Sequence, residues 1–535
     1  MNQCENSHYD QDRPLSHPFA AADDGCEDPP FRRGNISFLF VPLCAAEWGI
    51  FMASLWHQTV SLPKQPALKG DLHTEVAVLG GGMAGVLTAF LLSRQGRRVV
   101  VLEAGRVAGG QTGNTTAKVT AQHGAIYHKL SQQNENNALL YAEANRNAIN
   151  AYQSIIQQEQ ISCEWERVPA LIYTKEQLDT LEQELQASKK AGCPVQFVHE
   201  TSLPFPVKGA VQMDDQAQFH PLKLINSILS DLTIYENTRA LNVEGDEIHT
   251  PNGTVKAEHI VFTTHFPFLN FPGAYFMRLH QERSYVIALR GAGKMNGMYY
   301  GIDPDGLSFR NSGNFLLLGG GSHRTGENPS GGQYAALLQS ARSFWPDCAQ
   351  ETRWSAQDCV PLDGIPYIGS YAESRPNWYV ATGFQKWGMT TSMVAAQLIT
   401  DAICQVENPY VGLFTPQRFS LSAAGPQLVS EGAHAVRGLS RELFSFPDEP
   451  LKELPPLHGG VIEWQGKKLG AFRDKDGTVY LVDTRCPHLG CQLAWNPEEH
   501  TWDCPCHGSR FDIHGRLISG PAQEDLAART LHSFS

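Results

Sequence analysis

A segment that begins at Glu75 constrains the fold more than any other part of the chain. It reads EVAVLGGGMAGVLTAFLLSRQGRRVVVLEAG, which predicts a buried strand, a glycine turn, a helix and a second buried strand. Gly80, Gly82 and Gly85 form a G-x-G-x-x-G pattern that permits a tight turn, a close approach to a pyrophosphate and close helix packing. Glu103 ends the second strand, where a carboxylate accepts hydrogen bonds from ribose hydroxyls. The segment predicts a Rossmann-like α/β domain that binds a dinucleotide, and by itself it does not distinguish NAD from FAD.

Several separate blocks resemble the FAD-dependent oxidoreductases of the D-amino-acid oxidase (DAO) superfamily. They are GGQTGNTTAKVTAQHG at 109–124, QFHPLKL at 218–224, IVFTTHFP at 260–267, LLLGGGSHRTG at 316–326 and WYVATGFQKWGMTTSMVAAQL at 378–398. The resemblance implies FAD as cofactor, and an FAD-binding domain joined to an α+β substrate domain. In the last block a second glycine turn precedes a helix, whose N-terminus would stabilise negative charge on the reduced flavin.

The glycine pattern and this resemblance together indicate two sets of site residues. The FAD-binding candidates are Gly80, Gly82, Gly85, Glu103, Thr112, Gly113, Thr115, Thr116, Gly383, Gly388, Met389 and Thr390. The candidates for substrate contact and catalysis are His265, Tyr285, Arg310, His323, Arg324, Lys386 and Trp387. Arginine and tyrosine are included because they can bind a carboxylate. All seven residue types are also common in purely structural roles, so no single one stands out.

Between these blocks, HPLKLINSILSDL predicts a helix, and residues 233–264 alternate like β-hairpins around Asn252-Gly253. We expect these strands to build the substrate domain and to return the chain to the FAD domain near Thr263.

Four of the twelve cysteines lie in two short boxes near the C-terminus, CPHLGC at 486–491 and CPCHGSRFD at 504–512. Such clustering indicates a metal site. Cysteine and histidine together suit zinc, and Cys491 and Cys506 would also permit a four-cysteine iron–sulfur centre. A [2Fe–2S] centre with two histidines in place of two cysteines has a raised potential.

The paired boxes resemble the Rieske proteins of respiratory cytochrome bc complexes. The resemblance implies that Cys486, His488, Cys504 and His507 hold a [2Fe–2S] cluster and that Cys491 and Cys506 form a disulfide. It also implies that the Ser509 hydroxyl bonds a bridging sulfide and that residues 520–522 (GPA) cover the cluster. Phe511 stands where high-potential members have a tyrosine that donates to a ligand sulfur, which predicts a lower potential here.

We therefore expect a multidomain protein: an α/β FAD-binding Rossmann-like domain with an α+β substrate domain, followed by a small all-β Rieske domain. The expected boundaries are an N-terminal extension at 1–51 that is disordered or untranslated, with Met52 as the start, an oxidoreductase at 52–418, a linker at 419–455 and the Rieske domain at 456–535.

Charge and hydropathy exclude some partners and locations. A net charge of −13 without a Lys/Arg run argues against nucleic acid. The apolar stretch 36–56 is interrupted by Pro42 and Glu47, so we expect no stable membrane span. Arg32-Arg33 is a poor match to a twin-arginine export signal, because acidic residues precede it. A cytoplasmic location is expected, with export as the alternative.

A flavin accepts electrons in pairs and a Rieske cluster carries one at a time. We therefore expect a small amine or amino-acid-like substrate to reduce FAD, and electrons to leave singly through the cluster to an external acceptor. Alternatives are the reverse direction in a redox sensor or electron-transfer module, and two unrelated domains merely fused. A Rieske mononuclear-iron oxygenase is disfavoured, because Thr120 stands where the acidic partner of His123 and His128 would be needed.

Overall fold

The computed structural model describes residues 53–418, 451 and 454–531. The expected N-terminal extension and most of the expected linker lie outside the described residues.

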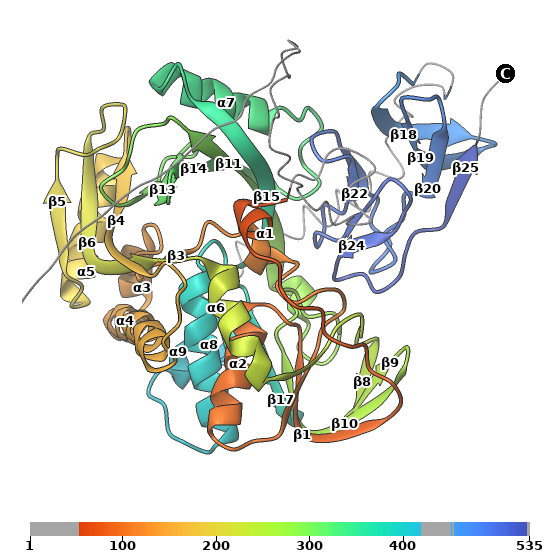
Figure 1. Ribbon diagram of the computed structural model, residues 1–535, viewed down its shortest axis with the longest axis horizontal. Coiled ribbons are helices and arrows are strands. Elements are labelled where there is room, and N and C mark those ends of the chain that lie inside the picture. The colour runs from red at the N-terminus through yellow and green to blue at the C-terminus, as the bar shows by residue number, and fades with distance from the viewer. Residues whose placement is uncertain (1–52, 419–450, 452–453, 532–535) are drawn as a thin grey trace, which may run out of the picture. The chain divides into compact units, whose positions relative to one another are not determined.

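The first sheet has the predicted strand–turn–helix–strand unit at its centre (Figure 1). Its strands pair in the order β16-β17-β10-β1-β2-β7, with β9 added to β10 and β8 added to β9. They are β1 (Leu72–Leu79), β2 (Val99–Leu102), β7 (Thr233–Tyr235), β8 (Asn242–Glu244), β9 (Glu247–Thr250), β10 (Gly253–Phe262), β16 (Tyr367–Ala372) and β17 (Arg375–Thr382). Strands β17, β10, β1, β2 and β7 run parallel, so their carboxyl ends share one edge. Ligands bind at that edge in open α/β sheets.

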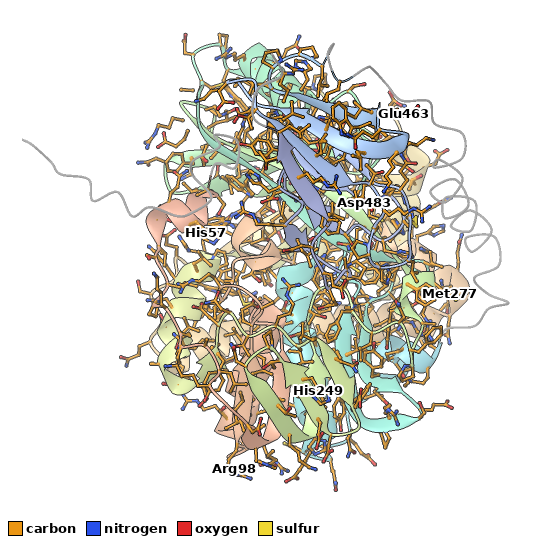
Figure 2. All side chains as sticks on the ribbon, turned by 90° about the vertical axis from the view of Figure 1, so that its right-hand side faces the viewer. His57, Arg98, His249, Met277, Glu463 and Asp483 are labelled. Atoms are coloured by element: carbon orange, nitrogen blue, oxygen red, sulfur yellow. A yellow bond between two sulfur atoms is a disulfide. The ribbon has the colours of Figure 1, made fainter. Side chains whose placement is uncertain are left out.

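The helices that follow the two glycine turns are buried, because they are apolar on nearly all sides. α2 (Met83–Arg94) and α8 (Gly388–Ile403) pack together in one core with β1. The remaining α-helices are α1 (Leu55–Thr59), α3 (Ile126–Gln133), α4 (Glu135–Gln158), α5 (Leu178–Lys190), α6 (Pro221–Ile228), α7 (Gln333–Phe344) and α9 (Val411–Phe414). Short 3₁₀ turns are η2 (Gln111–Asn114), η3 (Leu229–Asp231), η4 (Tyr275–Met277) and η5 (Pro416–Arg418). Arg98, which precedes β2, marks the edge of the sheet opposite the glycine turn (Figure 2).

A second, mostly antiparallel sheet forms the α+β part. Its order is β15-β11-β14-β13-β12-β4-β6-β3, with β5 beside β6. The strands are β3 (Lys118–Val119), β4 (Glu166–Thr174), β5 (Val195–Val198), β6 (Gly209–Gln218), β11 (Leu279–Arg290), β12 (Met298–Gly301), β13 (Ser308–Ser312), β14 (Phe315–Arg324) and β15 (Ala349–Pro361).

The expectation that residues 233–264 build the substrate domain is wrong. The hairpin at Asn252-Gly253 is present between β9 and β10, but β7 to β10 all belong to the first sheet, with β1 and β2. β10 is a central strand parallel to β1. Its apolar end, IVF at 260–262, is buried on both faces, which an alternating pattern alone did not indicate.

The C-terminal domain is a small all-β unit of two antiparallel sheets. The first contains β18 (His458–Trp464), β19 (Lys467–Arg473), β20 (Val479–Asp483) and β25 (Ala528–Leu531). The second contains β21 (Ala494–Asn496), β22 (Thr501–Asp503), β23 (Arg510–Phe511) and β24 (Leu517–Ser519). The predicted fold class is thereby confirmed for all three parts. None of the helices in the described part of the chain has both the length and the apolar character to cross a bilayer.

Candidate active site and metal centre

The first glycine turn has no room for side chains at two of its three glycines. A Cβ on Gly85 would lie 1.9 Å from the carbonyl oxygen of Gly80, and a Cβ on Gly80 would lie 2.7 Å from that of Thr263. Gly80 also has a φ of +107°, which L-residues with side chains rarely adopt. A Cβ on Gly82 meets only the Thr112 hydroxyl, at 3.3 Å. Gly80 and Gly85 therefore permit the packing of β1, β10 and α2, whereas Gly82 keeps the turn accessible.

The Glu103 carboxylate follows β2 and lies beside this turn. Its oxygens accept hydrogen bonds from the backbone N–H groups of Gly81 and Gly105, both at 2.7 Å. Burial raises the pKa of Glu103, while these two N–H groups favour the charged form. Each oxygen keeps a second lone pair, so the carboxylate can still accept a ribose hydroxyl.

A cavity of about 340 Å³ extends from the first glycine turn to the second glycine turn, which joins β17 to α8. Its lining extends from Glu103 to Gly388 and Met389 at the N-terminus of α8. Ten of the predicted site residues line it: Gly80, Gly82, Glu103, Thr112, Thr115, His265, Gly383, Lys386, Gly388 and Met389. The other predicted residues outside the C-terminal boxes do not line it: Gly85, Gly113, Thr116, Tyr285, Arg310, His323, Arg324, Trp387 and Thr390.

Several of the residues that do not line the cavity position its walls. Thr390 exchanges two hydrogen bonds of 2.8 Å with the backbone of Thr120, joining α8 to the 109–124 segment. Arg310 donates to the carbonyl oxygens of Ala117 and Phe219, at 2.8 and 3.0 Å. Its guanidinium thereby holds together the backbone of the 109–124 segment and that of the 218–224 block.

Lys386 precedes α8 and lies among charged groups at the cavity. Its Nζ is 3.4 Å from Asp358 and 3.7 Å from Glu282. Burial disfavours the charge of Lys386, but the two carboxylates outweigh it and raise its pKa. Burial also raises the pKa of Asp358 despite the lysine, whereas His280 and Lys386 lower that of Glu282 to about 2. Asp358 and Glu282 therefore favour the charged form of Lys386 beside the N-terminus of α8.

The next residue, Trp387, belongs to an aromatic group beside this charge. Its ring stacks on His123 at 4.8 Å and meets the edge of Tyr300 at 5.1 Å. Burial lowers the pKa of His123 to about 3, so the ring is neutral. His123 Nε2 is buried and has no hydrogen-bond partner among the described residues.

Three predicted substrate residues lie instead where the C-terminal domain meets β11 and β14. The Tyr285 hydroxyl is 3.0 Å from His323 Nε2, and Arg324 donates to the Pro505 carbonyl at 3.2 Å. Their roles as substrate residues remain predictions.

The two C-terminal boxes bring the predicted cluster residues together. Cys486 and Cys504 are buried free thiols that contact one another, and the rings of His488 and His507 lie 4.8 Å apart. Burial lowers the pKa of His488 to about 4 and that of His507 to about 3, so both imidazoles are neutral, as metal ligands must be. Both Nδ1 atoms are buried without a hydrogen-bond partner in the described structure. Two thiols and two unsatisfied ring nitrogens fit a [2Fe–2S] cluster.

The disulfide between Cys491 and Cys506 is present, as predicted. The sulfurs of Cys491, Cys504 and Cys506 lie within 4.8 Å of one another, but two of them are bonded together. They are therefore not thiolates, which removes the four-cysteine alternative. Ser509 Oγ accepts a hydrogen bond of 3.0 Å from Ala522 N, which ties the 520–522 loop to the second box. Phe511 is fully buried in the cluster of side chains that contains the four cysteines.

Some cavity residues were not predicted from sequence. They are Arg239, Thr263, Gln357 and Asp358, and residues 518–523 of the C-terminal domain. Thr263 was identifiable, because it directly follows β10 at the same edge as the glycine turn. Residues 520–522 were predicted as a loop that covers the cluster, but not as part of this cavity. Arg239, Gln357 and Asp358 belong to no local motif.

Known proteins match both parts of the chain. Residues 75–402 match the family of FAD dependent oxidoreductases (DAO), and residues 446–533 match the Rieske [2Fe-2S] domain. YhfW of Bacillus subtilis, described as a Rieske 2Fe-2S iron-sulfur protein, is 39% identical over 489 residues, which is 88% of this chain and 96% of the relative. The cytochrome b6-f complex iron-sulfur subunit 1 of Nostoc sp. is 46% identical over 50 residues, which is 9% of this chain and 28% of that protein.

Two solved structures share the fold of the larger part. Glycine oxidase from Geobacillus kaustophilus has a TM-score of 0.56 at 20% identity, covering 65% of this chain and 100% of its own. L-proline dehydrogenase from P. horikoshii has a TM-score of 0.56 at 16% identity, covering 66% and 98%. With the glycine turns, the cavity and the two boxes in place, the chain belongs to the DAO family of FAD-dependent oxidoreductases and carries a C-terminal Rieske [2Fe-2S] domain.

Proposed function

We propose that this enzyme oxidises a small amine or amino-acid-like substrate at FAD and passes the electrons singly through the Rieske cluster to an external acceptor. The observation that carries the proposal is the wall of the flavin cavity, because residues 518–523 of the Rieske domain line it together with both glycine turns. A domain that forms part of the cavity brings its cluster close to the flavin, which supports direct electron transfer between the two centres.

When bound, FAD supplies a two-electron acceptor for the hydride of the substrate. The chain's own residues would bind and orient it: the turn at Gly82 would meet the pyrophosphate, Glu103 would accept from the ribose, and the N-terminus of α8 would face the flavin ring. The Lys386 ammonium lies at this helix terminus. Its charge and the helix dipole together stabilise negative charge at that end of the cavity.

The charges at the ring end support an amine more than a simple carboxylic acid as substrate. Asp358 lines the cavity, and Glu282 lies beside it on the neighbouring strand, β11. Of the arginines, Arg239 alone is among the described residues that line the cavity. Arg310 and Arg324 donate to backbone carbonyls. Arg239 interacts with Glu103, away from the N-terminus of α8. Beside that terminus an amine can therefore approach two carboxylates, whereas a carboxylate would meet only the Lys386 ammonium among the described cavity residues.

Anaerobic mixing with a panel of amines, amino acids and simple carboxylic acids tests the proposal. We expect an amine to bleach the flavin absorbance, followed by the electron paramagnetic resonance signal of the reduced cluster. Asp358→Asn should raise the KM for the amine more than it lowers kcat, whereas Asp305→Asn, in an exposed turn, serves as the matched control. Bleaching without cluster reduction would contradict electron transfer from the flavin to the cluster. Bleaching only by a reduced one-electron donor would favour the reverse direction.

A further inference from the structure

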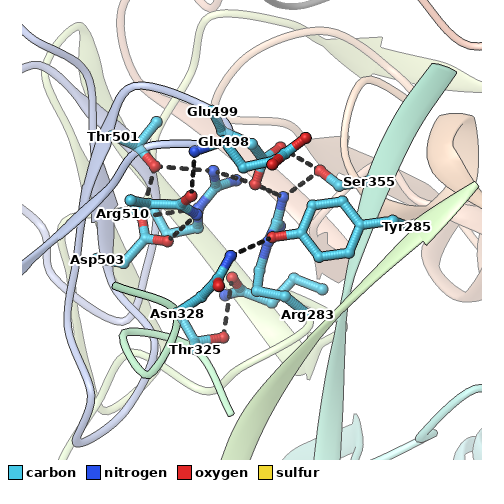
Figure 3. A network of polar contacts seen from close by, with 12 residues as sticks. Arg283, Tyr285, Thr325, Asn328, Ser355, Glu498, Glu499, Thr501, Asp503 and Arg510 are labelled. Atoms are coloured by element: carbon cyan, nitrogen blue, oxygen red, sulfur yellow. Dashed lines mark hydrogen bonds and ion pairs between the residues drawn. The ribbon is translucent and has the colours of Figure 1, made fainter. Parts of the chain in front are cut away.

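Four buried charged residues lie where the Rieske domain meets the flavin domain (Figure 3). Arg283 on β11 pairs with Glu499, which lies in the turn between β21 and β22. Glu499 also accepts from Arg510 at 2.9 Å, and Arg510 binds Asp503 at 3.0 Å. Arg283 is 2% exposed and Glu499 is 3% exposed. Ser355 on β15 donates a further hydrogen bond to Glu499.

The charges in this cluster balance only when the two domains are together. Arg283 is the one cation from the flavin domain, and the Rieske residues Glu499, Asp503 and Arg510 carry a net negative charge. A buried ion pair adds little net stability, because desolvation offsets the attraction, but removing one partner leaves a buried charge uncompensated. The cluster therefore specifies one docked position of the Rieske domain and excludes displaced ones.

A Rieske carboxylate also caps a helix of the flavin domain. Helix α7 begins after Gly332, which has no side chain to cap it. The Glu498 carboxylate accepts from Gly332 N and, at 3.4 Å, from Tyr334 N. A negative charge at this terminus satisfies N–H groups that have no partner within the helix and interacts well with its dipole.

Two glutamines of the flavin domain reach the loop that carries His507. Gln281 Nε2 donates to the His507 carbonyl at 2.6 Å, and Gln357 Nε2 donates to the Gly508 carbonyl at 2.8 Å. Both side chains are almost fully buried, at 2% and 1% exposure. Gln357 also lines the flavin cavity. A Cβ on Gly508 would lie 2.7 Å from Gln281 Cβ, so the loop lies directly against this side chain.

We propose that the Rieske domain stays docked through the whole reaction, and that Gln281 and Gln357 position the His507 loop against the flavin cavity so that electrons cross a fixed interface. With both groups bound, the two electrons of the reduced flavin would cross one at a time to the cluster and from there to a one-electron acceptor outside the protein. The proton that arrived with the hydride would pass to solvent, so each substrate oxidation would release two electrons and one proton. The direction of flow rests on the proposed function, whereas the fixed docking does not.

Hydrogen exchange of the full-length protein tests the docking without any substrate. The amides of Gly332 and Tyr334 donate to Glu498, so their exchange reports undocking directly. We expect equal protection in the oxidised and the dithionite-reduced protein. Arg283→Met should speed this exchange by about a hundredfold, because Arg510 alone then faces both Glu499 and Asp503 and one buried negative charge is left uncompensated. Arg290→Met on the same strand removes an exposed ion pair with Glu351 and a contact with the Phe315 ring, neither of which involves the Rieske domain, and should leave this exchange unchanged. Unprotected amides in either redox state of the unchanged protein would overturn the proposal.

The rate of electron transfer provides a second test. Photochemical reduction of the flavin needs no amine, so a failed substrate panel leaves this test intact. In a fixed interface the rate of cluster reduction is independent of viscosity. A rate that falls in proportion to added glycerol would mean that the domain moves, and would refute the proposal. Gln281→Leu should slow cluster reduction while leaving the flavin absorbance and the cluster's electron paramagnetic resonance spectrum unchanged. An unchanged rate in that variant would remove Gln281 from the positioning role.

Discussion

Replacing Gly85 by alanine tests whether the glycine turn holds the fold together or only admits the cofactor. The new Cβ would lie 1.9 Å from the Gly80 carbonyl oxygen and 2.7 Å from Thr263 Oγ1. Real Cβ atoms essentially never come closer than 3.0 Å, so α2 and the turn must separate by at least about 1.1 Å. The obstructing atom is backbone, which cannot rotate away as a side chain can. We therefore expect a loss of stability at the upper end of the range for overpacking, about 3 kcal/mol.

The matched control is Gly82→Ala in the same turn, whose Cβ meets only a hydroxyl at 3.3 Å. Urea unfolding of the flavin-free protein, with flavin content measured separately by absorbance, distinguishes the two roles. Gly85→Ala should lower both the unfolding midpoint and the flavin content. Gly82→Ala should lower flavin content alone, because its methyl group points where the pyrophosphate approaches. Equal midpoints for Gly85→Ala and the unchanged protein would refute the packing argument.

Three further outcomes follow from the Rieske box and from a buried histidine. Phe511→Tyr should raise the midpoint potential of the cluster in a redox titration by about 60 mV, if the new hydroxyl donates a bond worth about 1.4 kcal/mol to a ligand sulfur; an unchanged or lower potential would contradict this. Replacing Cys491 and Cys506 by serine opens a loop with a sequence separation of 15 and should cost about 3 kcal/mol, measured as an earlier loss of cluster absorbance in urea. Burial lowers the pKa of His123 to about 3, so the folded protein binds fewer protons than the unfolded chain below pH of about 6.5, and stability is lost as pH falls through that window. His123→Gln should reduce this loss by up to about 1.4 kcal/mol per pH unit in unfolding measurements between pH 7 and 5. An unchanged dependence of the unfolding free energy on pH would mean that another group binds the proton.

The parts of the site that the sequence predicted are those made by local motifs. The turn at Gly80 and Gly85, the carboxylate of Glu103 and the two cysteine–histidine boxes each depend on residues a few positions apart, or at a strand end next to the turn. The disulfide and the FAD cofactor came from family resemblance. Asp358 and Gln357 were missed because strand pairing alone brings them to the cavity. His323 and Arg324 lie in a block that resembles the family, and Tyr285 lies opposite that block on the neighbouring strand β11. All three adjoin the Rieske domain here, which a motif in one domain does not reveal.

The residue pattern of strand β11 explains why the interface between the two domains could not be predicted from the sequence. Its first half, LHQERSY at 279–285, has polar residues on both faces, so it lacks the alternation of apolar and polar residues that marks a half-buried strand. Because side chains alternate, Gln281, Arg283 and Tyr285 share the face that meets the Rieske domain, whereas Glu282 faces Lys386 at the cavity. One strand therefore contacts both redox sites, with Gln281 on one side and Glu282 on the other. Gln281 and Arg283 are buried and therefore need polar partners, which the Rieske domain provides. Glu282, on the partly exposed face, pairs with Lys386 at the cavity.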